Sequence, residues 1–110
     1  MTLTTHVLDI SIGSPAAGIA IALYAIEAST RTLLANATTN ADGRTDAPLA
    51  ETLAPGRYEL GFTVAAYFAA RNAATFYDEI TVRFQIHDDG LHYHVPLLLA
   101  PWGYSTYRGS

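Results

Sequence analysis

The sequence predicts a mainly β protein, a β-sandwich with one short helix, and three observations support this. Apolar and polar residues alternate over short segments along much of the chain, which is typical of strands with one buried face. Clusters of glycine, proline, asparagine and aspartate lie between these segments and predict turns. One alanine-rich stretch interrupts the alternation. Roughly seven strands and one helix in a chain of 110 residues are typical of a sandwich.

The first half of the chain contains three predicted strands. The first spans residues 3–10 and is closed by a loop at Gly13-Ser14-Pro15. The second spans residues 19–26, where the alternation defines one face of large residues and one of small residues. The third spans residues 31–39 and is polar at both ends. Residues 40–44 follow as a strong turn, because the Asp42-Gly43 pair tolerates the positive φ that tight turns need.

The middle of the chain contains a loop, a strand and the helix. Residues 48–56 show little pattern and are predicted to form the loop, and residues 57–64 alternate again as a strand. Residues 65–74 are rich in alanine and contain no β-branched residue, which favours helix. A helix of this length needs tertiary packing to be stable.

The last third of the chain is predicted to be a hairpin followed by one more strand. Residues 80–86 alternate strictly, Asp88-Asp89-Gly90 predicts a hairpin turn, and residues 91–99 are the predicted return strand. A last short strand is expected to run toward the C-terminus. The whole chain, residues 1–110, is predicted to be a single domain, because no linker, repeat or low-complexity tract divides it.

Composition excludes several classes of protein. Half of the residues are hydrophobic, so a core can form without covalent cross-links, and the absence of cysteine rules out disulfides and thiolate metal sites. The net charge is −4, with six arginines and no lysine, which argues against nucleic acid and anionic membranes as partners. The N-terminus lacks a basic region followed by a long apolar run, and no segment approaches the ~20 apolar residues of a membrane span. We therefore expect a soluble, cytoplasmic protein.

Three histidines are the main candidate functional residues. His92 and His94 are two residues apart in a strand, so they point to the same face, next to the apolar run that follows them. His6 lies in the first predicted strand. Each histidine also has an interpretation without a function. His92 and His94 could simply form a half-exposed polar face, and His6 could be a structural residue hydrogen-bonded to a backbone carbonyl. Two histidines at this spacing with a third from another strand could also bind zinc, but no carboxylate supports this and no metal site is predicted.

The remaining polar candidates are weaker. Arg44 follows the predicted turn, where it is either a solvated charge or a planar donor for an anionic or heterocyclic ligand. His87 is expected to be exposed and incidental, and Asp88 and Asp89 to be a solvated turn. The sequence contains no Ser-His-Asp signature, no glycine-rich phosphate loop and no dinucleotide-binding pattern. Residue chemistry alone therefore does not specify a substrate.

Three blocks of sequence, in this order and at these separations, resemble the 5-hydroxyisourate hydrolases, the transthyretin-like enzymes of purine degradation. The blocks are residues 3–9 with 13–16, residues 40–44, and residues 92–99 leading to 104–110. The C-terminal Tyr107-Arg108-Gly109-Ser110 is the most specific of the family marks. The resemblance extends over the whole chain.

The resemblance implies a transthyretin-like, or prealbumin-like, sandwich of two four-stranded antiparallel sheets with one short helix. It implies a homotetramer, a dimer of dimers, with active sites at the interface between dimers. The catalytic residues that it implies are His6, Arg44, His94 and Ser110. His6, Arg44, His92 and Tyr107 are implied to bind the substrate.

The implied reaction is the hydrolysis of 5-hydroxyisourate to 2-oxo-4-hydroxy-4-carboxy-5-ureidoimidazoline in urate degradation. Water attacks a ring carbonyl, with His6 and His94 dividing water activation and proton return between them. Arg44 is expected to stabilise developing charge, and Ser110 to orient a histidine or the substrate through its hydroxyl or a terminal carboxylate. No metal or organic cofactor is implied. The alternatives are a transthyretin-type carrier of a small aromatic ligand and a structural or adhesive sandwich domain.

Overall fold

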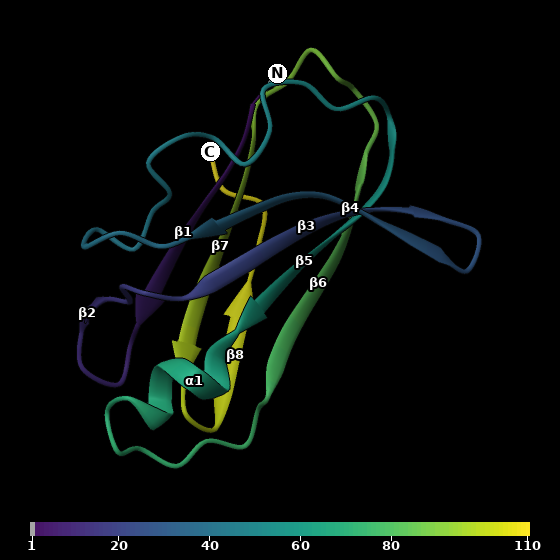
Figure 1. The fold of residues 1–110 in the computed structure, drawn as a ribbon. Helices are drawn as coiled ribbons and strands as arrows, with labels where there is room; N and C mark the ends of the chain where they lie inside the picture. The colour runs from purple at the N-terminus through teal and green to yellow at the C-terminus, as the bar shows by residue number, and fades with distance from the viewer. Residues whose placement is uncertain (1) are drawn as a thin grey trace.

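The computed structural model describes residues 2–110 as two packed four-stranded sheets and one short helix (Figure 1). One sheet has the strand order β2-β1-β7-β8 and the other β4-β3-β5-β6. The elements are β1 (Leu3–Asp9), β2 (Ser14–Pro15), β3 (Ala20–Glu27), β4 (Thr30–Thr38), β5 (Gly56–Thr63), α1 (Val64–Ala69), β6 (Glu79–Ile86), β7 (Tyr93–Ala100) and β8 (Gly103–Thr106). The predicted mainly β sandwich with one short helix is confirmed. Within the described residues, no helix is long and apolar enough to cross a membrane.

The core lies between the sheets and is built by strand alternation. In β1 every second residue is buried, with Leu3 and Val7 fully enclosed, and Leu97 and Leu99 of β7 lie beside them. The other sheet contributes fully buried side chains such as Leu60 and Phe62. Burying a side chain of this size stabilises the fold by about 1.5–3 kcal/mol. The alternation therefore fixes which residues of β1 and β7 remain on the outer face of the sheet.

The central pair of the first sheet differs from the prediction, because β1 and β7 are parallel. The register runs from Leu3 opposite Tyr93 to Asp9 opposite Leu99. The implied arrangement of two antiparallel sheets is therefore wrong for this sheet, which is mixed. Two strands far apart in the sequence can pair in either direction, since no short turn constrains them.

The predicted hairpin at Asp88-Asp89-Gly90 is also wrong. The strand before it, β6, pairs with β5, whereas the strand after it, β7, pairs with β1 and β8 in the other sheet. The segment therefore crosses between the two layers. β7 crosses because it is apolar along almost its whole length, and a strand of that kind is most stable in the middle of a sheet. A local turn signal does not distinguish a hairpin from such a crossover.

The helix is shorter than the predicted residues 65–74. It covers Val64–Ala69, after which the Asn72 backbone adopts a left-handed conformation with φ of 56° that ends the helix. Tyr67 connects the helix to β1, because its hydroxyl donates a hydrogen bond of 2.8 Å to Asp9 Oδ2. Burial, together with Asp9, raises the pKa of Tyr67 to about 12. The segment predicted as a loop at residues 13–15 includes the two-residue edge strand β2.

Candidate functional site

The outer face of the β2-β1-β7-β8 sheet brings the three predicted histidines together. Tyr93 and Val95 point into the core, so His94 and the preceding His92 point outward. On β1, Thr4 and His6 are two of the half-buried residues that alternate with the buried ones. The parallel register places Thr4 opposite His94, and the next outward residue, His6, opposite Pro96. Two strands distant in the sequence thus supply adjacent imidazoles.

His94 is the most closely surrounded of these side chains. Its Nδ1 lies 2.8 Å from the Thr4 hydroxyl, and its ring packs parallel to that of His92 at an interplanar angle of 14°. Partial burial lowers the pKa of His94, and electrostatic interaction with Arg44, His6 and His92 lowers it further. The neutral imidazole is therefore favoured at neutral pH, and a neutral imidazole can accept a proton.

Arg44 is held near the histidines by the turn that precedes it. Gly43 has φ of +73°, and its carbonyl accepts a hydrogen bond of 2.8 Å from the Val7 backbone amide. A Cβ at this position would lie only 2.3 Å from the Val7 carbonyl oxygen, so only glycine allows the turn to dock against β1. The docked turn places the exposed Arg44 side chain beside the histidine-bearing face.

Arg44 and His92 line one cleft of about 240 Å³ on this face. The residues that line it are Thr4, Thr5, Arg44, Thr45, Asp46, Ala47, Pro48 and His92. The lining is about equally polar and apolar, and its polar part combines a guanidinium, an imidazole, the Asp46 carboxylate and several hydroxyls. Such a cleft can bind a small, flat, hydrogen-bonding ligand.

The C-terminal segment lies against His94. The Gly109 amide donates a hydrogen bond of 2.7 Å to the His94 carbonyl oxygen. A Cβ on Gly109 would lie 2.6 Å from His94 Cδ2, so the imidazole packs directly over the bare backbone. Ser110, the exposed neighbour of Gly109, therefore ends next to the histidine pair, and Figure 1 shows the C-terminus beside β1 and β7.

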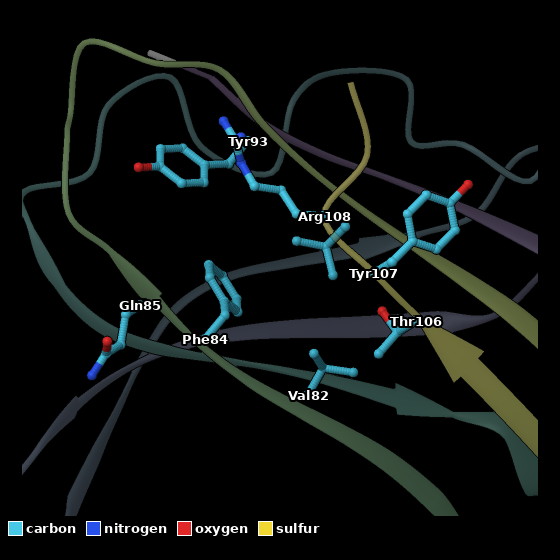
Figure 2. Close-up of a pocket in the computed structure, with 8 residues that line it drawn as sticks. Val82, Phe84, Gln85, Tyr93, Thr106, Tyr107 and Arg108 are labelled. Atoms are coloured by element: carbon cyan, nitrogen blue, oxygen red, sulfur yellow. The ribbon is translucent and has the colours of Figure 1, made fainter.

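Tyr107 lies apart from this cleft. Its side chain is 59% exposed, and Figure 2 shows its ring directed away from Val82 and Phe84. Tyr107 borders a second, apolar hollow of about 200 Å³ where the two sheets open between β6 and β8. That hollow is lined by Val82, Phe84, Gln85, Tyr93, Val95, Thr106, Tyr107 and Arg108.

The structure adds two residues that were not predicted from the sequence. Arg108 lies over the Tyr93 ring, 4.9 Å from its centroid, and donates a hydrogen bond of 3.1 Å to the His92 carbonyl oxygen. Thr4 contacts both His92 and His94. Thr4 shares the outward face of β1 with His6, and that alternation was a signal for it. Arg108 belongs to the C-terminal family mark, but no role was predicted for it.

The other polar candidates lie away from the cluster. His87, Asp88 and Asp89 are exposed, and Asp88 Oδ1 accepts a hydrogen bond of 2.8 Å from the Gly90 amide within the loop. Across residues 2–110, no three histidine or carboxylate side chains are arranged to hold a metal ion. The absence of a metal from the reaction stays a prediction.

The fold and its histidine–arginine cluster define a transthyretin-like sandwich with a polar site on one outer sheet face. Residues 3–109 match the family described as the HIUase/Transthyretin family, and the chain belongs to that family. It is 54% identical to 5-hydroxyisourate hydrolase of Deinococcus radiodurans, over 98% of this chain and 95% of the relative.

Solved structures of two enzymes and of a transthyretin resemble this chain. The 5-hydroxyisourate hydrolase of Klebsiella pneumoniae is 41% identical, with a TM-score of 0.87 and full coverage of both chains. (S)-Allantoin synthase is 40% identical with a TM-score of 0.91, but this chain spans only 43% of that chain. Sea bream transthyretin, solved in complex with thyroxine, is 27% identical with a TM-score of 0.91, over 99% of this chain and 95% of that one. The fold is thus shared by proteins of different function.

Proposed function

We propose that this protein is a 5-hydroxyisourate hydrolase that forms 2-oxo-4-hydroxy-4-carboxy-5-ureidoimidazoline by hydrolytic ring opening. The observation that supports this most directly is the position of His94. Its imidazole is half-buried, and burial together with Arg44 and His6 lowers its pKa. The 54% identity to a named hydrolase supports the same substrate. Proton transfer by imidazole at neutral pH is the chemistry that opening a cyclic amide requires.

In the proposed mechanism, His94 accepts a proton from water as the water oxygen bonds to a ring carbonyl carbon. Its lowered pKa keeps it in the neutral form that can act as a base. The bond between that carbon and the ring nitrogen then breaks, and the nitrogen takes a proton as it leaves. His6, on the neighbouring strand, is the proposed donor of that proton.

Arg44 and Ser110 have supporting roles in this proposal. The Arg44 guanidinium, at the rim of the cleft, stabilises the oxyanion that forms when water attacks, since a fixed positive charge costs no reorganisation during the reaction. Ser110 orients His94 or the substrate from its place next to Gly109. His92 and Tyr107 are proposed to contact the heterocycle. His92 lines the cleft, whereas Tyr107 lies apart from it on the exposed C-terminal segment.

We further propose a homotetramer, a dimer of dimers, with active sites at the subunit interface. The histidine face lies open on one chain, and a facing subunit would exclude water and strengthen the electrostatic contacts. Exposed apolar side chains on this molecule include Ile10, 56% exposed, and Trp102, 69% exposed. A metal-independent, cofactor-free reaction in the cytoplasm completes the proposal, and each of these points stays a prediction.

The main competing function is that of a carrier for a small aromatic ligand. Sea bream transthyretin has the same fold at 27% identity, so the fold does not separate a carrier from an enzyme. The cluster of His6, Arg44 and His94 favours the hydrolase, because binding a neutral aromatic ligand needs no imidazole with a lowered pKa.

The decisive experiment follows the decay of 5-hydroxyisourate by ultraviolet absorbance. Urate oxidase generates the compound from urate in the cuvette, and the protein or its His94→Ala variant is then added. We expect the wild-type protein to accelerate the decay and the variant to lose most of this effect. Wild-type protein that binds the compound without accelerating its decay would indicate a carrier instead.

A further inference from the structure

Four side chains on the outer sheet face form a continuous hydrogen-bonded chain that ends at His94. The Thr4 hydroxyl lies 2.8 Å from His94 Nδ1 and 3.3 Å from His92 Nε2. His92 Nδ1 in turn lies 2.5 Å from the Thr2 hydroxyl. The His92 and His94 ring centroids are 6.4 Å apart, so Thr4 is the group that connects them.

We propose that Thr4 is a positioning residue that sets the tautomer of His94 and connects it, through His92 and Thr2, to solvent as a proton relay. This inference rests on the proposed function of His94 as the base. The relay deepens that function because it gives the proton taken from water a path out of the site.

The tautomers of His92 and His94 are coupled, because the groups between them have a fixed number of protons. A threonine hydroxyl has one hydrogen to donate, and a neutral imidazole has one N–H. If His94 Nδ1–H donates to Thr4, then the Thr4 hydroxyl donates to His92 Nε2 and His92 Nδ1–H donates to Thr2. If Thr4 instead donates to His94 Nδ1, every hydrogen bond in the chain reverses. The two rings therefore have the same tautomer in either arrangement.

The two arrangements correspond to two catalytic states of His94. In the first, Nδ1 holds the proton and Nε2 is free to act as a base. When Nε2 takes a proton from water, the Nδ1 proton passes to Thr4, the Thr4 proton to His92 Nε2, and the His92 Nδ1 proton to Thr2. The Thr2 hydroxyl then releases its own proton to solvent. One proton enters at His94 and one leaves at Thr2, so each ring and hydroxyl keeps a single proton.

The surroundings of His94 favour removal of that proton. Arg44 from the docked turn, His6 from β1 and His92 from its own segment all face His94 and disfavour a second positive charge there. The Gly109 backbone packs against another part of the His94 ring. His92 is exposed on the single chain, so the relay leads from the half-buried His94 toward the exposed side of the site.

Thr4→Val and Thr4→Ser test the proposal, with Thr75→Val as a matched control. Thr75 is also half-buried, but its hydroxyl donates to the Pro101 carbonyl oxygen at 2.7 Å, and it lies outside the cleft and the histidine cluster. We expect Thr4→Val to lower kcat about 10–100-fold with little change in KM, as loss of groups that orient a histidine commonly does. Thr4→Ser should restore most of kcat. Thr75→Val should lower stability but leave kcat per folded molecule nearly unchanged.

Two further measurements separate a relay from a structural role. The solvent isotope effect, measured across mixtures of light and heavy water, should report several protons in motion in the wild type and fewer in Thr4→Val. Nitrogen-15 NMR of the substrate-free protein should show the same tautomer for His92 and His94, and should lose this match in Thr4→Val. A Thr2→Val variant should change the isotope effect in the same direction, and it keeps the test informative if Thr4→Val does not fold.

Opposite tautomers in the wild type, or an unchanged kcat and isotope effect in Thr4→Val, would overturn the relay while leaving the hydrolase intact. Failure of the wild-type protein to open the ring would overturn the proposed function. Matched tautomers in that case would still report the hydrogen-bonded chain, so the two failures are distinguishable.

Discussion

The two outer faces of the sandwich both contain charged and polar side chains, but they pair them differently. On the β4-β3-β5-β6 sheet, the buried Glu59 accepts hydrogen bonds from Arg31 at 2.9 Å and from Arg83 at 2.8 Å. Burial alone would raise the pKa of Glu59, but the hydrogen bonds from Arg83 and Arg31 outweigh it and lower the pKa. Arg31 also stacks on the Tyr24 ring, 4.0 Å from its centroid.

The β2-β1-β7-β8 sheet instead keeps part of its hydrogen-bonding capacity for a ligand. His94 uses Nδ1 for Thr4, which leaves Nε2 as the ring nitrogen for water or substrate. The exposed Arg44 directs its charge at a cleft and lies near imidazoles that do not neutralise it. Removing one partner of a buried, paired carboxylate destabilises a fold, whereas a histidine with a shifted pKa beside a cleft is typical of a site that binds or reacts.

The largest expected difference between the two faces is the loss of activity when a histidine of the β2-β1-β7-β8 face is replaced. His94→Ala and His6→Ala should each lower kcat/KM for ring opening by about 10²–10⁴, because loss of one general acid or base has that effect. The assay is the decay of 5-hydroxyisourate, with circular dichroism to show that each variant is folded. Folded variants that stay within a few-fold of wild type would show that the histidines are not the catalytic groups.

Arg44→Lys tests whether the guanidinium acts by charge alone. Lysine keeps the positive charge but loses the planar, two-pronged donor, so we expect an intermediate loss of kcat. Arg44→Ala should cost about 10²–10³ in kcat, as removal of an oxyanion-stabilising donor does. Equal activity of Arg44→Ala and wild type would place Arg44 outside the reaction.

Glu59→Gln should have the reverse pattern, a loss of stability with little loss of activity. Glutamine keeps the shape but removes the charge that two arginines contact, so the free energy of unfolding should fall by about 1–3 kcal/mol. Urea unfolding measures that fall, and the ring-opening assay serves as its control. A large drop in kcat at unchanged stability would contradict the division between the two faces.

The smallest expected effect is on pH dependence. The pKa of His94 is lowered in the folded protein, so the native state binds that proton less readily than the unfolded chain does. Stability from this group is present above the ordinary histidine value of about 6.5 and is lost as pH falls through the lowered pKa. The fall of kcat/KM on the acid side of its pH profile should likewise have its midpoint below about pH 6.5. In His94→Ala the pH dependence of stability should be flatter over that range.

Much of the fold could be predicted because the alternation of apolar and polar residues in a strand is a local property of the sequence. Residues 80–86 alternate strictly, and β6 was found at Glu79–Ile86. The alternation also predicted that His92 and His94 point away from Tyr93 and Val95, and the structure confirms it. The helix end was missed because alanine content does not show where Asn72 will adopt a left-handed backbone.

The sequence by itself determined which residues face the core and which side chains are available for chemistry, since both follow from side-chain type and a period of two. Only the tertiary structure decided that β7 crosses to the other sheet and pairs in parallel with β1. That pairing places Thr4 beside His94, and the contact of Gly43 with Val7 brings Arg44 to the same face. These neighbours are separated by long stretches of chain, so they are selected by burial and hydrogen bonding of the whole molecule and not by any local pattern.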